Sequence, residues 1–123
     1  MRAVLCRELK GPSALTVADV PQPTLSGPTS VRIAVHAAGV NFADTLIVAG
    51  QYQEKPALPF VPGLEGAGVV IETGAAVKRV RIGDRVMATF NQGAFAEEAV
   101  TEENEAWPIP ASMDFATAAG FSV

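Results

Sequence analysis

Hydrophobic and polar residues alternate over several short stretches of this chain, and glycine or proline ends most of them. The clearest stretch is 30–40, where Val31, Ile33 and Val35 face one side and the residues between them face the other. Such stretches predict short strands separated by turns. The predicted strands are 1–9, 15–20, 30–40, 66–72, 85–90, 93–100 and 106–109.

One internal segment has a helical pattern instead. Residues 42–49 can form two helical turns, with Asn41 as a good N-cap and Asp44 near the positive end of the helix dipole. Gly50 is expected to end the helix. The residues that follow, 51–62, are polar and interrupted by prolines, which predicts a loop.

A second helix is predicted at 115–123, with Ser112 as its N-cap and Asp114 in its first turn. The pattern stops at Val123 without a capping residue. We therefore expect the sequence to be a fragment of a longer protein.

The composition narrows the class of protein. The chain has 123 residues, of which 49% are hydrophobic and 18% charged, as expected of one globular domain. A net charge of −4 argues against nucleic-acid binding. Cys6 is the only cysteine, which favours a reducing compartment. Neither a signal peptide nor an apolar run of membrane-spanning length is present, so we expect a cytoplasmic protein.

The run 63–68, Gly-Leu-Glu-Gly-Ala-Gly, combines three glycines with one carboxylate beside an apolar strand. Glycine permits a close approach of other groups, whereas burying Glu65 is costly unless it is held by partners. We expect Glu65 to be structural. The glycines open a strand rather than a helix, so the run is not a dinucleotide-binding fingerprint.

Five ordered segments together resemble one family, the zinc-independent quinone oxidoreductases of the zeta-crystallin type in the medium-chain dehydrogenase/reductase superfamily. The segments are 37–45, 50–52, 59–70, 83–86 and 93–97. The resemblance implies a mainly β fold, a GroES-like partly open β-barrel with short helices. Residues 1–123 would be the catalytic domain, and the Rossmann domain that follows it in the family is absent from this chain.

The resemblance also implies an activity, the NADPH-dependent reduction of a small-molecule quinone or enone by a longer homo-oligomeric enzyme. NADPH would be bound mainly by the absent domain, so the isolated chain should be inactive. Two alternatives remain open: an enoyl-thioester or 2-alkenal reductase, and a non-catalytic GroES-like binding or assembly module. Without the second domain, apolar surface is expected around Phe115, Ala118, Ala119 and Phe121.

The resemblance bears on metal binding too. In the zinc-containing branch of the superfamily, a cysteine and a histidine ligand stand at the positions matching Asn41 and Leu64. Neither residue here is a zinc ligand. His36, the only histidine, lies on an alternating strand and is expected to be an ordinary strand residue. We therefore predict no metal site.

Without a metal, uncharged donors must stabilise the oxygen of the acceptor as it gains negative charge. The candidates are the Asn41 amide and the Tyr52 phenol, which match polar positions of the cleft in the family. The alternatives are that Asn41 only caps a helix and that Tyr52 only covers the barrel mouth. The predicted site comprises Asn41 and Tyr52 as catalytic residues, Asn41, Phe42 and Thr45 for the cofactor, and Leu46, Gln51 and Tyr52 for the substrate.

Overall fold

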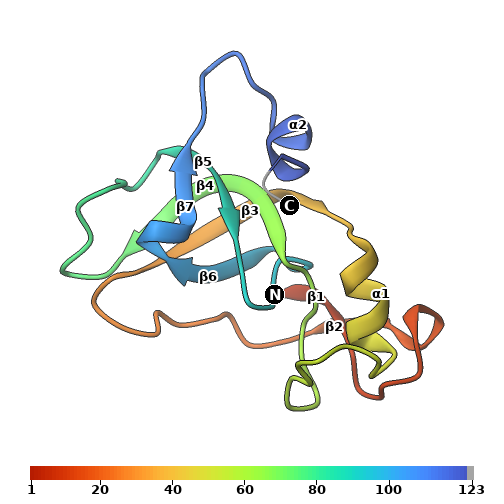
Figure 1. The fold of residues 1–123 in the computed structure, drawn as a ribbon. Helices are drawn as coiled ribbons and strands as arrows, with labels where there is room; N and C mark the ends of the chain where they lie inside the picture. Colours follow the sequence, from red (N-terminus) through yellow and green to blue (C-terminus); the bar gives the residue numbers. More distant parts are fainter. Residues whose placement is uncertain (122–123) are drawn as a thin grey trace.

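The computed structural model describes residues 1–121 and shows a mainly β fold with two sheets (Figure 1). The strands are β1 (Arg2–Leu5), β2 (Thr16–Asp19), β3 (Ser30–Gly39), β4 (Glu65–Thr73), β5 (Arg85–Thr89), β6 (Glu98–Glu102) and β7 (Ala106–Pro108). The α-helices are α1 (Phe42–Val48) and α2 (Phe115–Ala119), and 3-10 turns lie at Pro12–Ala14 and Glu103–Glu105. Within the described residues the sheets do not close into a barrel, and no helix is long and apolar enough to cross a membrane. The predicted mainly β, partly open fold is confirmed.

The larger sheet is antiparallel, with the strand order β6-β3-β4-β5-β7. Its core includes branched side chains at alternate strand positions, among them Val31, Ile33, Val70 and Val86, each at most 1% exposed. This is the pattern expected when one face of a sheet is buried, because side chains alternate between the two faces.

The smaller sheet consists of β1 paired with β2, and α1 packs against residues that flank these strands. An isolated bridge pairs Cys6, just after β1, with Phe60 in the loop before β4. Ile47 and Val48 on the buried face of α1 pack in one cluster with Cys6 and Phe60. This packing fixes α1 beside the small sheet (Figure 1) and so determines where its first turn lies.

Two glycines let β3, β4 and α2 approach one another closely. A methyl group at Gly68 would collide with the backbone of Ala34 in β3. A methyl group at Gly39 would collide with the Glu65 carboxylate and lie 2.8 Å from the carbonyl oxygen of Ala119. The glycine-rich run at 63–68 therefore serves strand packing, and the buried Glu65 lies where β3, β4 and α2 meet.

The strand predicted at 93–100 begins only at Glu98, where β6 starts. Before that point the chain turns toward β1: the carbonyl of Phe95 accepts a hydrogen bond from β1 at 2.8 Å, and the N–H of Glu97 donates one at 3.2 Å. The strand predicted at 1–9 is also too long, because β1 ends at Leu5. The other five strands begin and end within one residue of their predicted bounds.

The predicted N-cap of α2 is wrong. Asp114 is the N-cap, and its Oδ1 accepts a hydrogen bond from the N–H of Thr117 at 2.7 Å. Ser112 lies within the preceding turn. The helix ends at Ala119, and the part of the prediction at 122–123 lies outside the described residues.

The expected apolar surface at α2 is only partly present. Phe121 is 67% exposed, but Ala118 and Ala119 are buried against the sheet, so that prediction is wrong for the two alanines. The ring of Phe115 contacts His36 of β3 at a centroid distance of 4.4 Å, and the guanidinium of Arg85 also lies over it. These contacts hold α2 against β3 and β5.

Candidate functional site

The predicted site residues lie in one segment, from the end of β3 through α1 into the loop that follows (Figure 1). Ile47 and Val48 anchor the second half of α1 in the core. The helix and its N-cap, which together carry four of the six predicted residues, therefore have a fixed position.

Asn41 is the N-cap of α1, as predicted, with extended backbone angles of φ −120° and ψ 158°. It forms a capping box with Asp44. The Asn41 N–H donates to Asp44 Oδ2 at 2.8 Å, and the Asp44 N–H donates to the Asn41 carbonyl at 3.0 Å. The backbone of Asn41 is thus held on both sides by one residue.

The side-chain nitrogen of Asn41 is the least satisfied donor in this segment. Nδ2 is buried and has no hydrogen-bond partner among residues 1–121. A buried donor without a partner costs about 1–3 kcal/mol. Such groups are rare in folded proteins, and each calls for an explanation. The arrangement leaves an amide donor ready for an acceptor that the described residues do not supply.

Asp44 lies on the buried face of α1 and is only 4% exposed. Burial raises the pKa of its carboxyl group, and the hydrogen bond from the Asn41 N–H partly offsets this effect. Its second oxygen, Oδ1, is buried without a hydrogen-bond partner in the described part of the chain. The sequence indicated a helix-start residue here but gave no sign of this burial.

Phe42, Thr45 and Leu46 lie on α1 with different exposure. Phe42 is 78% exposed, an unusual state for a large apolar side chain. Thr45 is half-buried, and its hydroxyl donates to the Phe42 carbonyl at 2.6 Å. It also lines a small cavity of about 80 Å³ together with Val40 and Asp44. Leu46 is half-buried, so the structure brings these residues together along one short helix.

Gln51 and Tyr52 lie beyond the helix in the exposed loop. The Gln51 N–H donates to the Leu46 carbonyl at 2.8 Å, which ties the start of the loop to α1. Tyr52 is 38% exposed, and none of the hydrogen bonds among the described residues involves its phenol. The phenol is therefore free to meet a ligand, and in the described residues no hydrogen bond joins it to the Asn41 amide.

Side chains that could bind a metal ion together do not cluster in the described residues. In the described part of the chain, no three histidine, cysteine, aspartate or glutamate residues are close enough to hold a metal ion. Cys6 is fully buried, and burial raises the pKa of its thiol. The absence of a metal from this site remains a prediction.

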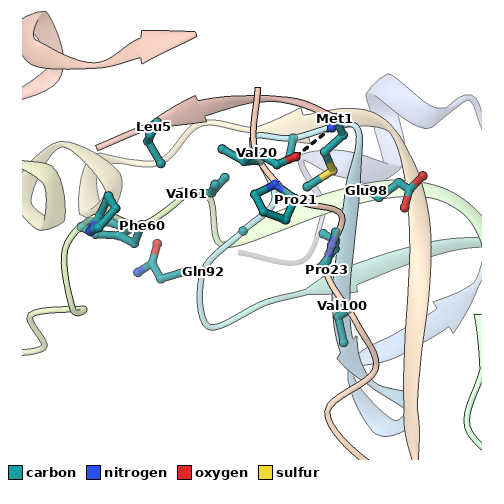
Figure 2. A pocket seen from close by; sticks show the side chains of 14 residues that line it. Met1, Leu5, Val20, Pro21, Pro23, Phe60, Val61, Gln92, Glu98 and Val100 are labelled. Carbon is teal, nitrogen blue, oxygen red and sulfur yellow. Dashed lines mark hydrogen bonds between the residues drawn. The ribbon is translucent and has the colours of Figure 1, made fainter. Parts of the chain in front are cut away.

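The structure contains a larger apolar cavity that the sequence did not reveal (Figure 2). Its volume is about 480 Å³, and its lining includes Leu5, Pro21, Phe60, Gln92 and Val100. These residues come from five separate segments, so no local motif could have indicated the cavity. None of the predicted site residues lines it.

Comparisons with known proteins bear on this geometry. The profile of the family described as alcohol dehydrogenase GroES-like domain matches residues 27–111. Quinone oxidoreductase-like protein 2 of Rattus norvegicus is 49% identical over 119 residues, which are 96% of this chain and 33% of that protein. The chain spans about a third of the length of the curated relatives it matches.

Solved structures of related proteins have the same fold as this chain. Human synaptic vesicle membrane protein VAT-1 homolog-like protein superposes with a TM-score of 0.92 at 37% identity, over 97% of this chain and 38% of that chain. Escherichia coli quinone oxidoreductase, solved in complex with NADPH, gives a TM-score of 0.90 at 30% identity, over 97% of this chain and 36% of that chain. The resemblance to quinone oxidoreductases inferred from the sequence is confirmed.

Proposed function

Since the chain belongs to the alcohol dehydrogenase GroES-like domain family, we propose that it forms the catalytic domain of an NADPH-dependent quinone oxidoreductase. Relatives named quinone oxidoreductase and a structural neighbour solved with NADPH support this proposal. The chain covers about a third of those proteins, so a cofactor-binding domain would be supplied by the rest of the polypeptide. The whole enzyme would be a cytoplasmic homo-oligomer.

The observation that carries the proposal is the Asn41 amide. Nδ2 is buried without a partner in the described residues, and the capping box with Asp44 holds the backbone of Asn41. A fixed, desolvated donor suits an oxygen that becomes more negative during a reaction, because such a donor needs no reorganisation. The carbonyl oxygen of a quinone or enone fits this donor, and so does the amide oxygen of a nicotinamide.

NADPH, when bound, would supply the hydride. The residues of this chain would hold and polarise the acceptor. Asn41 would donate from Nδ2 to the acceptor oxygen, and the exposed Tyr52 phenol would donate a second hydrogen bond or a proton. The exposed ring of Phe42 and the half-buried Thr45 would contact the cofactor, and Leu46 and Gln51 the substrate.

We propose that no zinc ion takes part. The side chains of Asn41 and Leu64, at the two positions where the zinc-containing branch has its ligands, are an amide and an alkyl group. The uncharged donors would take over the role of the Lewis acid. Turnover should therefore persist after exhaustive treatment with a chelator.

The test is NADPH oxidation by the full-length protein with a quinone in the presence of EDTA. Asn41→Ala should lower kcat by about 10²–10³-fold, the usual effect of losing one oxyanion donor. The matched control is Asn104→Ala, an exposed asparagine near β7, which should leave kcat unchanged. Full turnover by Asn41→Ala would contradict the proposal.

A further inference from the structure

An aspartate accepts a backbone hydrogen bond at the start of each described α-helix, but the two aspartates lie in opposite environments. Asp114 caps α2 from an exposed position, and the hydrogen bond from Thr117 holds the pKa of its carboxyl below its usual range. Asp44, in the first turn of α1, accepts from the N–H of the N-cap residue Asn41 at a buried position, and burial raises the pKa of its carboxyl group. The charged form is thus favoured at Asp114 and disfavoured at Asp44.

Helix stability alone does not account for Asp44. A buried carboxylate is costly, and Oδ1 has no hydrogen-bond partner in the described residues. The five-residue α2 begins with an exposed aspartate, Asp114, as its N-cap and avoids this cost. Some other requirement must therefore favour a buried acceptor at this position.

The position of Asp44 on α1 suggests why a buried acceptor is needed there. Asp44, Ile47 and Val48 share the buried face of α1, so the Asp44 side chain is confined by the same packing that anchors the helix. From this position Oδ2 accepts the hydrogen bond from the Asn41 N–H. The Asn41 N–H is thereby tied to the core by this 2.8 Å hydrogen bond, and the side-chain nitrogen of Asn41 is left unpaired among residues 1–121.

We infer that Asp44 is a positioning residue: its buried carboxylate fixes the backbone of Asn41 and so aims the Asn41 amide at the acceptor oxygen. This inference rests on the proposed function, because it gives Asn41 a partner in the reaction. Catalysis depends steeply on such placement, since an error of about 1 Å can cost about 100-fold in rate. The carboxylate itself does not touch the substrate.

The test is a double-mutant cycle on kcat in the full-length enzyme. Asp44→Ala should lower kcat at least tenfold, whereas Asp44→Asn, which keeps an oxygen that can accept from the Asn41 N–H, should stay within about threefold of the wild type. In the Asn41→Ala background, Asp44→Ala should cause no further loss, because there is no amide left to position. Asp44→Ser is the second variant if Asp44→Ala does not fold.

The matched control is Asp114→Ala, which removes the cap of the other helix. It should lower the melting temperature by a few degrees, as Asp44→Ala should in both backgrounds, and leave kcat unchanged. A purely structural role for Asp44 predicts the same factor of loss in kcat with and without Asn41, and that result would overturn the inference. An unchanged kcat for Asp44→Ala would also overturn it.

The two proposals fail in different ways. If Asn41→Ala retains full kcat, the role of Asn41 in the proposed function is wrong, and Asp44 has nothing to position. If Asn41→Ala slows turnover but Asp44→Ala does not, the proposed function stands and only the positioning role is wrong.

Discussion

Replacing Gly68 by alanine tests whether the close approach of β3 and β4 determines the geometry of the sheet. The new methyl group would collide with the carbonyl of Ala34, whose carbon atom would be 2.8 Å away, and would lie 3.1 Å from the Cα of Val35. These are backbone atoms of a strand paired on both sides, so no side-chain rotation relieves the contact. The strands would have to separate locally.

The cost can be built up from its parts. Gly68 faces Val35 of β3 on one side and Val86 of β5 on the other, so a displacement disturbs two ladders. Overpacking a well-packed site costs about 1–3 kcal/mol. Weakening about two backbone hydrogen bonds adds about 1 kcal/mol each. We expect a total loss of about 3–5 kcal/mol, a large part of the stability of about 5–15 kcal/mol that is usual for a domain.

Urea unfolding measures this loss, with fluorescence of Trp107, the single tryptophan, as the probe. With a slope of about 2 kcal/mol/M, the midpoint of Gly68→Ala should fall by about 2 M. The control is Gly27→Ala, whose new methyl group would meet nothing within 4 Å and should change the stability by less than about 0.5 kcal/mol. Equal midpoints for the two variants would refute the reasoning.

Three further predictions concern other sites. The backbone N–H groups of Lys78 and Arg79 donate to the Glu103 carboxylate and hold its pKa below the usual range; the resulting stability is present above the ordinary pKa of 4.5 and lost as the pH falls. Melting curves of Glu103→Gln should therefore vary less between about pH 5 and pH 3 than those of the wild type, and parallel curves would contradict this. Cys6 is buried and the pKa of its thiol is raised, so a thiol reagent should react about 100-fold faster with the chain unfolded in urea than with the folded chain. The rate of the reagent's absorbance change measures this difference. Tyr52→Phe should lower kcat of the full-length enzyme about tenfold or more and leave the melting temperature unchanged, because the phenol is partly exposed and bonds to no described residue; unchanged turnover would remove Tyr52 from the site.

The sequence predicted those parts of the fold that depend on local patterns. The strand at 30–40 was identifiable because a sheet with one buried face requires alternation, and the structure places Val31 and Ile33 in the core. The helix at 42–49 was identifiable from Asn41 and Gly50, whose positive φ of 71° only glycine readily adopts. These signals lie within a few residues of the elements they define.

The rest depended on contacts between distant segments. The stretch 93–97 alternates like a strand, but its backbone bonds to β1 at Phe95 and Glu97, and the strand β6 begins only at Glu98. The unpaired state of Asn41 Nδ2 and the burial of Asp44 follow from how α1 packs, which a cap motif does not specify. The motif therefore indicated candidate site residues, and only the structure shows which of their polar atoms have no hydrogen-bond partner in the described residues.

A crystal structure of the full-length protein with NADPH and a quinone analogue would test the role of Asn41 most directly. We predict that Asn41 Nδ2 lies within about 3.2 Å of an oxygen of the bound acceptor or of the nicotinamide, while Asp44 still accepts from the Asn41 N–H. A complex in which Nδ2 donates instead to a carbonyl of the protein, away from both bound molecules, would contradict the account.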